Sequence, residues 1–247
     1  MQYASFEISL GNHEAVQAVF QRSLLQNPDV ELWQCYLQYI KSINSDGQGG
    51  IRAEGRATVD TVYKFALEQM GKDLNMGPVW LEYIQFLRDG PATTAYEEGQ
   101  RMDAVRGTYL LAVSIPLSNI EAIWRDYDQY ENALNRTTAR KLIHERSQIY
   151  MKNRQASKEL KIKLDALPRD RLALPMAAMK GKDAARQARH AWKTYLQWEK
   201  AFAAQIEDPV RTAQFPLKDR VLLAYKQALS HLRYCPDIWY TSLTIDP

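Results

Sequence analysis

The sequence predicts an all-α protein, an α-solenoid of antiparallel helix pairs with about five repeats, incomplete at both ends. Three observations predict this fold. An aromatic triplet recurs along the chain, an amphipathic pattern lies between successive triplets, and a proline follows most of these patterns. The 247 residues include only 11 glycines and 10 prolines, and alternating β-branched residues are scarce, so a helical protein is favoured over a sheet.

The aromatic triplets mark the first helix of each pair. In WRDYDQYE (124–131) the aromatic residues are three apart, so on a helix they cover an arc of about 120°. We expect these rings to be buried between neighbouring hairpins, and we expect Glu131 and Glu199, which directly follow two triplets, to bind polar groups of an adjacent helix. The complete triplets are Trp33, Tyr36 and Tyr39; Trp80, Tyr83 and Phe86; Trp124, Tyr127 and Tyr130; and Trp192, Tyr195 and Trp198.

The second helix of each pair has an aromatic residue at its centre, with apolar residues four positions before and after it. This period is typical of an amphipathic helix. The four segments are VQAVFQRSL (16–24), VDTVYKFAL (59–67), VRGTYLLAV (105–113) and VLLAYKQAL (221–229). Prolines follow at 28, 78, 116 and 236, and proline suits the first turn of the next helix. In NPDVELW (27–33), Asn27 is the expected N-cap.

Three segments depart from this regular repeat. SINSDGQGGI (42–51) predicts a loop inserted within the second pair. The second helix of the fourth pair is expected to be long, from residues 137–139 to about 164. LPRDRLALPMAAMKGKD (167–183) predicts a basic, proline-containing linker. The predicted domains are therefore repeats over 1–166, a linker over 167–183 and further repeats over 184–247.

The motifs resemble the half-a-TPR (HAT) repeat, with its Trp-x2-Tyr-x2-aromatic-Glu pattern. The tetratricopeptide pattern fits less well, because Trp33 is not followed at the expected position by Leu-Gly. Within HAT proteins, the chain resembles the amino-terminal HAT half of the suppressor of forked family, the scaffolding subunits of cleavage stimulation factor. The motifs that carry this resemblance are QRMDAVRGTY, IEAIWRDYDQYE, ERSQIYMKNRQASKE and WKTYLQWEK.

This resemblance implies a nuclear, non-catalytic scaffold that works with other cleavage and polyadenylation factor subunits. Family members form homodimers through a carboxy-terminal HAT half, which we expect to be absent from this chain. We therefore expect the chain to be a truncated fragment or a truncated gene model. The alternatives are an RNA-binding HAT module in splicing or ribosomal RNA processing, and a tetratricopeptide adaptor outside RNA biology.

Basic residues are concentrated in one part of the chain. Residues 152–190 hold eleven Lys and Arg against four acids, whereas the remaining residues have a net charge of −4. Such a segment attracts RNA phosphates or an acidic partner. The candidate contacts are Lys152, Arg154, Lys158 and Lys161.

Other kinds of site have little support in the sequence. No phosphate-binding loop, zinc-ligand series or nucleophile elbow occurs, so we expect no catalysis, cofactor or metal. His231 and Cys235 are four residues apart, but two ligands alone make a poor metal site, and packing is the expected role. No apolar run reaches the roughly 18 residues of a membrane helix. The two cysteines, Cys35 and Cys235, are expected to be reduced.

Overall fold

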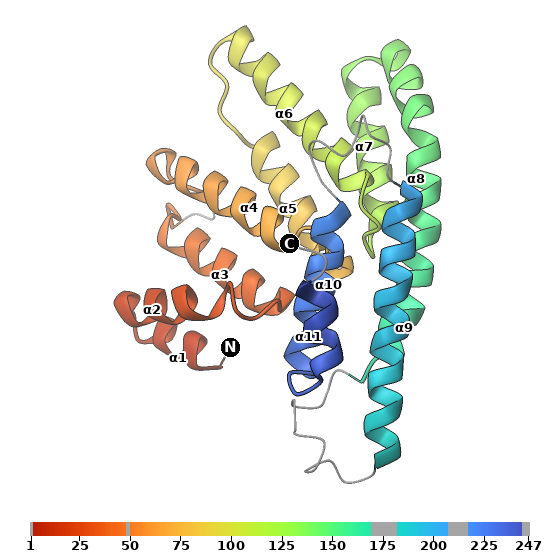
Figure 1. The fold of residues 1–247 in the computed structure, drawn as a ribbon. Helices are drawn as coiled ribbons and strands as arrows, with labels where there is room; N and C mark the ends of the chain where they lie inside the picture. The colour runs from red at the N-terminus through yellow and green to blue at the C-terminus, as the bar shows by residue number, and fades with distance from the viewer. Residues whose placement is uncertain (1, 48–49, 169–181, 207–216, 244–247) are drawn as a thin grey trace. The chain divides into compact units, whose positions relative to one another are not determined.

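The computed structural model describes all residues except 1, 48–49, 169–181, 207–216 and 244–247 (Figure 1). The described residues form helices and contain no strand beyond an isolated bridge between Ser45 and Ile51, so the all-α prediction is confirmed. In chain order the elements are α1 Gln2–Ser9, α2 His13–Ser23, α3 Val30–Ile43, η1 Ala53–Gly55, α4 Arg56–Met70, η2 Leu74–Met76, α5 Gly77–Arg88, α6 Ala95–Val113, α7 Ile120–Leu134, α8 Arg136–Asp165, α9 Lys182–Ile206, α10 Leu217–His231 and α11 Pro236–Leu243.

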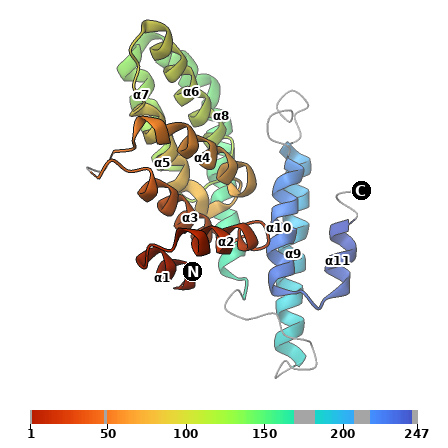
Figure 2. The ribbon, with the colours of Figure 1, turned by 90° about the vertical axis from the view of Figure 1, so that its left-hand side faces the viewer.

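The chain forms two compact units. Unit 1 contains residues 1–24 and 29–160, and unit 2 contains residues 25–28 and 161–247. In unit 1, consecutive helices form the antiparallel hairpins α1–α2, α3–α4, α5–α6 and α7–α8 (Figure 1 and Figure 2). In unit 2, α9 pairs with α10, and α11 packs on α10. Both units are thus built from the helix pairs that the sequence predicts.

Caps and prolines explain where several helices begin. The Asp29 side chain accepts a 2.9 Å hydrogen bond from the backbone N–H of Glu31, so Asp29 is the N-cap of α3. The prediction of Asn27 as the cap was therefore wrong, because Asp29 lies closer to the first turn. Pro78 and Pro236 both lie in the first turn of their helices, where the missing N–H costs no intrahelical bond.

The irregular segments agree with the sequence where the structure describes them. α3 ends at Ile43 and η1 begins at Ala53, so the 42–51 insertion lies within the second hairpin as expected. The long helix is α8, with 30 residues. Residues 169–181 of the predicted linker lie outside the described residues, and α9 begins at Lys182. The domain boundaries at 166–167 and 183–184 stay a prediction.

An aromatic seam joins successive hairpins in unit 1. At each junction, the central ring of a second helix packs against two triplet rings of the next first helix. Ring centroids are 5.0–6.0 Å apart, within the range that aromatic pairs prefer. The seam consists of Phe20 with Tyr36 and Tyr39, Tyr63 with Tyr83 and Phe86, and Tyr109 with Tyr127 and Tyr130.

The tryptophans that begin the triplets are mostly buried. Trp33, Trp80 and Trp192 are 1%, 2% and 2% exposed. Trp124 differs, because its ring is only half-buried and stacks on Tyr150 of α8, with centroids 4.5 Å and planes 5° apart. Trp124 therefore packs on the second helix of its own hairpin and is less completely buried than the other three tryptophans.

The fourth triplet packs within unit 2. Trp192 contacts Tyr195 and His231, with centroid distances of 6.0 and 5.4 Å. The half-buried Trp198 stacks on Phe202 of the same helix at 5.1 Å. The triplet rings of this hairpin thus contact residues of their own hairpin, α9 and α10, whereas those of the seam contact the preceding hairpin.

Candidate interaction surfaces

A polar contact links α3 to α5 beside the aromatic seam. Lys41, eight residues after Trp33, donates to a carboxylate oxygen of Glu82 at 2.7 Å, and Glu82 lies two residues after Trp80. The hydroxyl of Tyr63, on the helix between them, donates to the same oxygen at 3.3 Å. The contact joins three successive helices, although its ion pair is partly exposed and contributes only about 0–1 kcal/mol.

The same arrangement recurs one hairpin later. Arg88 lies 3.3 Å from a carboxylate oxygen of Asp126, and the Tyr109 hydroxyl donates to the other oxygen at 2.5 Å. At the preceding junction the central ring is Phe20, which lacks a hydroxyl, and Cys35 occupies the position of the carboxylate. At these three junctions of unit 1, the hydroxyl and the acid therefore occur together or not at all, which indicates that each supports the other there.

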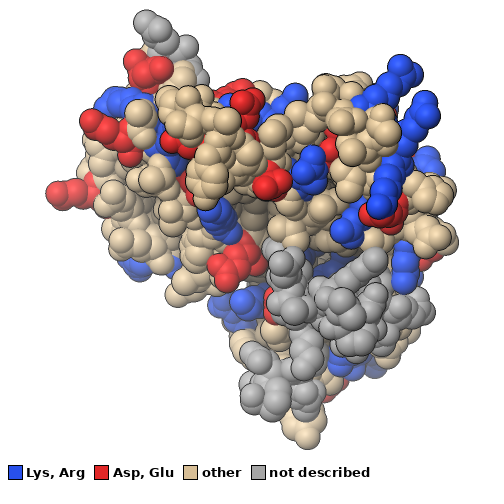
Figure 3. Space-filling model, turned by 90° about the horizontal axis from the view of Figure 1, so that it is seen from above, with Lys and Arg blue, Asp and Glu red and all other residues tan. Residues whose placement is uncertain are grey.

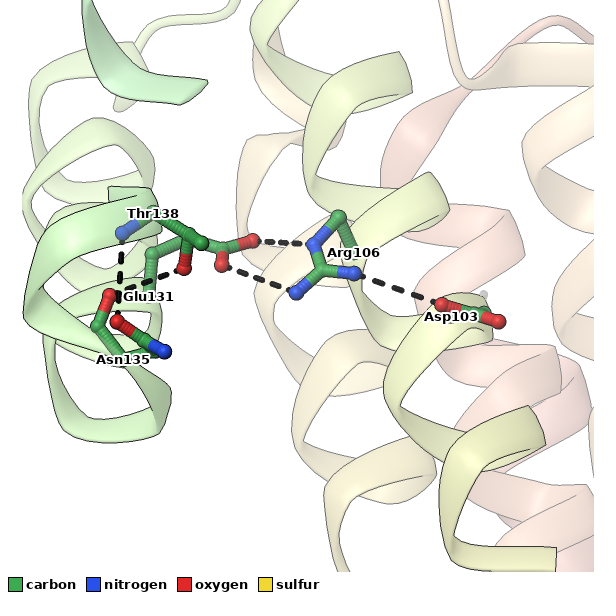
Figure 4. Close-up of polar contacts among 5 residues, drawn as sticks. All are labelled: Asp103, Arg106, Glu131, Asn135 and Thr138. Atoms are coloured by element: carbon green, nitrogen blue, oxygen red, sulfur yellow. Dashed lines mark hydrogen bonds and ion pairs between the residues drawn. The ribbon is translucent and has the colours of Figure 1, made fainter. Parts of the chain in front are cut away.

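A buried carboxylate also fixes α7 to α6 (Figure 4). Glu131 is 1% exposed and accepts two hydrogen bonds from the Arg106 guanidinium, at 2.6 and 3.1 Å. The same guanidinium donates to Asp103 at 3.4 Å. The expected role of Glu131 is thus confirmed. At the adjacent end of α8, Asn135 accepts a 3.3 Å hydrogen bond from the Thr138 N–H and acts as its cap.

The corresponding acid of unit 2 makes a similar contact with a different neighbour. Glu199 accepts hydrogen bonds of 2.7 and 2.9 Å from Arg220, and the two side chains are 1% and 5% exposed. Arg220 lies on the following helix, α10, whereas Arg106 lies on the helix before its acid. The expectation for Glu199 is confirmed, and the acid at this repeat position serves both kinds of helix contact.

The seam tyrosines are neutral at physiological pH, and burial makes their ionisation still less favourable. Burial raises the pKa of Tyr63, Tyr83 and Tyr109 far above the usual value, and the nearby carboxylates raise it further. Burial also raises the pKa of Tyr127 to about 12. These hydroxyls therefore remain protonated donors at physiological pH, and the seam has no group that changes charge there.

A groove of about 670 Å³ opens between α4, α5 and α6. Phe86 and Leu111 provide apolar lining, and the turn after α5 forms its rim. Arg56 covers the Phe86 ring at 4.3 Å and donates to the Phe86 carbonyl oxygen at 2.7 Å. Arg101 donates to the carbonyl oxygen of Gly90 at 2.6 Å. Backbone contacts thus hold both arginines in place, and the groove is preformed.

The four predicted basic contacts all lie on the second half of α8. Arg154 donates to Glu121 of α7 at 2.5 Å, and Lys158 lies 4.0 Å from the same oxygen. The hydrogen bond from Arg154 lowers the pKa of Glu121. Lys152 and Lys161 are exposed. This half of the helix is therefore partly neutralised by α7, and RNA binding by these residues stays a prediction.

The described residues give little indication of a catalytic or metal-binding site. Among them, no three His, Cys, Asp or Glu side chains form a metal-binding group. None of the described helices has both the length and the apolar character needed to cross a bilayer. Cys35 and Cys235 are free thiols. His231 stacks on Trp192 and so contributes to packing, as expected.

The fold and these contacts define an α-helical repeat protein whose triplet aromatics hold its hairpins together. Residues 1–244 match the family model of the suppressor of forked protein. The chain therefore belongs to the suppressor of forked family, and the resemblance found in the sequence is confirmed.

Two fungal relatives show the extent of this similarity. The mRNA 3'-end-processing protein rna14 of Schizosaccharomyces pombe is 36% identical over 239 residues, which cover 97% of this chain and 31% of that protein. The protein of the same name in Gibberella zeae is 36% identical over 254 residues, covering 97% of this chain and 24% of that protein. The chain thus spans less than a third of either relative.

A solved structure shows the same fold. The crystal structure of CstF-77 aligns with 99% of this chain and 46% of that chain, with a TM-score of 0.70 and 16% sequence identity. The similarity extends over almost all of this chain, so the arrangement into stacked hairpins is shared.

Proposed function

We propose that the chain is part of a nuclear, non-catalytic scaffold of pre-mRNA 3'-end processing, which binds other cleavage and polyadenylation factor subunits. The observation that carries the proposal is its membership of a family whose relatives are mRNA 3'-end-processing proteins. The structure supports a scaffold role, because the aromatic repeats are used for packing. Stacked hairpins of this kind offer extended surfaces for binding other proteins.

The groove between α4, α5 and α6 is the surface that we assign to a partner. Its apolar lining includes Tyr83, Phe86 and Leu111, and anchored arginines border it. Apolar pockets with a few fixed polar groups are typical binding sites. A preformed surface also costs less entropy on binding. We propose that an extended segment of another processing subunit occupies this groove through apolar side chains.

Two glycines of α6 allow a matched test of the groove. Gly107 lines it, whereas Gly99 does not, and a Cβ added at either position meets no heavy atom within 4 Å. Gly107→Arg should therefore fill the groove without disturbing the fold, and Gly99→Arg is the control with the same added charge. Both changes remove a helical glycine, so neither should lower helix stability.

The experiment uses the full-length protein from its own cells, with an affinity tag. Nuclear extracts from cells expressing each variant are purified, and 3'-end-processing subunits are quantified by mass spectrometry. The Gly99→Arg variant should retain these subunits, whereas Gly107→Arg should lose at least one of them. Equal recovery with both variants would refute the groove as the docking site. Failure of the unaltered protein to recover any processing subunit would refute the scaffold role.

A further inference from the structure

The first third of α8 carries a row of exposed basic side chains. Arg136, Arg140 and His144 follow one another at intervals of four residues, and Lys141 lies next to Arg140. We refer to these four residues as the basic stripe. Side chains four apart lie on one face of a helix, so the stripe is a continuous surface about 12 Å long. Its two arginines and its lysine have no ion-pair partner within the described part of the chain.

Acidic residues near the stripe do not neutralise it. At the end of α7, Glu131 is bound to Arg106, and the Asp128 carboxylate accepts a 3.1 Å hydrogen bond from Asn132. Glu145 is exposed and follows His144 in the chain. None of these acids forms an ion pair with the stripe within the described part of the chain. Figure 3 shows the molecule from the end at which α8 begins, and Lys and Arg side chains gather on the right-hand side of this face.

The chemistry of the stripe differs from that of the second half of α8. No large hydrophobic side chain is exposed between residues 136 and 150, whereas Met151 and Ile162 are 56% and 72% exposed. The centre of a protein interface is apolar and poor in charges, and the stripe itself offers no large apolar side chain, although Leu134 just before it is 42% exposed. Guanidinium groups instead form paired hydrogen bonds with phosphate oxygens.

We propose that the basic stripe binds the phosphate backbone of single-stranded RNA. Arg136, Arg140 and Lys141 contact phosphates, and the exposed ring of His144 stacks on a base, as aromatic side chains do in sites for single strands. This site is separate from the groove and does not depend on the scaffold role. It also differs from the Lys152–Lys161 segment, where Arg154 and Lys158 already meet Glu121.

The test measures binding of a fluorescent 20-nucleotide oligouridine to the chain by anisotropy at several salt concentrations. In the stripe variant, Arg136, Arg140 and Lys141 become Glu. In the matched variant, Lys152, Lys158 and Lys161 become Glu, which produces the same charge change on the same helix. Circular dichroism checks that both variants keep their helices. A third variant, His144→Ala, removes the ring without reversing any charge.

The stripe variant should bind RNA at least tenfold more weakly than the unaltered chain, whereas the matched variant should lose much less affinity. Three lost phosphate contacts should lower the slope of log affinity against log salt by about 2. His144→Ala should weaken binding with no change in that slope. Absence of RNA binding at 50 mM salt, or equal losses in the two triple variants, would overturn the proposal. Competition by polyglutamate as effective as that by unlabelled RNA would assign the stripe to acidic proteins instead.

Discussion

The substitution Arg106→Ala should destabilise unit 1 by about 3 kcal/mol. It leaves the Glu131 carboxylate, which is 1% exposed, without its two guanidinium hydrogen bonds. Removing one partner of a buried ion pair costs about 3–5 kcal/mol. The Arg106 side chain is 31% exposed, so water enters the vacated space and solvates part of the charge. The lower end of the range is therefore expected.

Two other arginines give the expected order of effects. Arg220→Ala should cost about 5 kcal/mol, because both members of its pair with Glu199 are at most 5% exposed and water has little access. Arg88→Ala should cost less than about 1 kcal/mol, since Arg88 and Asp126 are 37% and 35% exposed. Burial of the pair, and not the number of ion pairs, sets the size of each loss.

Urea unfolding followed by circular dichroism measures these losses, and native-state hydrogen exchange locates them. In the Arg106→Ala variant, amides of α6 and α7 should lose protection by a factor of about 100, the equivalent of roughly 3 kcal/mol. Changing both Arg106 and Glu131 to Met should restore much of the stability, because no charge remains buried. A loss for Arg106→Ala as small as that for Arg88→Ala would refute this reasoning. So would a double variant no more stable than the single one.

Three further predictions follow from burial. Trp80→Ala should cost about 3–5 kcal/mol and Trp124→Ala clearly less, because Trp124 is half-buried; equal melting temperatures would contradict this. Phe20→Tyr should lower the free energy of unfolding in urea by about 1–3 kcal/mol, because the new buried hydroxyl meets Cys35 where the other two junctions have a carboxylate. Unchanged stability would count against the pairing of tyrosine hydroxyl with carboxylate. Folding raises the pKa of Tyr127 to about 12. The contribution of Tyr127 to the free energy of unfolding is therefore complete below about pH 10 and is lost as the pH rises towards 12. The melting temperature should fall as the pH rises over this range, and it should fall less steeply with pH in Tyr127→Phe. A melting temperature that does not change with pH would refute the burial of the Tyr127 hydroxyl as the cause.

The fold could be predicted because local spacing determines it. Three aromatics at intervals of three must share one helical face, and prolines mark where the next helix begins. The seam contacts were not predictable in detail, because they join residues distant in the chain. Lys41 and Glu82, for example, are 41 positions apart. Only the joint occurrence of Tyr63 with Glu82 and of Tyr109 with Asp126 could have indicated these contacts.

The candidate basic surface shows a different limit of sequence reasoning. A count of charges over 152–190 does not reveal which of them are paired. Arg154 meets Glu121, which lies 33 positions earlier, and this pair reduces the free charge of the segment. The arginines of the basic stripe, which have no ion-pair partner among the residues that the structure describes, precede that segment. Their availability depends on which acids α7 brings nearby, and only the packed helices show this.

Hydroxyl-radical footprinting with mass spectrometry tests the central claim most directly, namely that the triplet rings hold the hairpins together. Trp33, Trp80 and Trp192 should be modified slowly, because they are at most 2% exposed. Tyr240, which is 73% exposed, should be modified rapidly in the same sample. If the three tryptophans reacted as fast as Tyr240, the rings would face solvent, and packing by aromatic repeats would be contradicted.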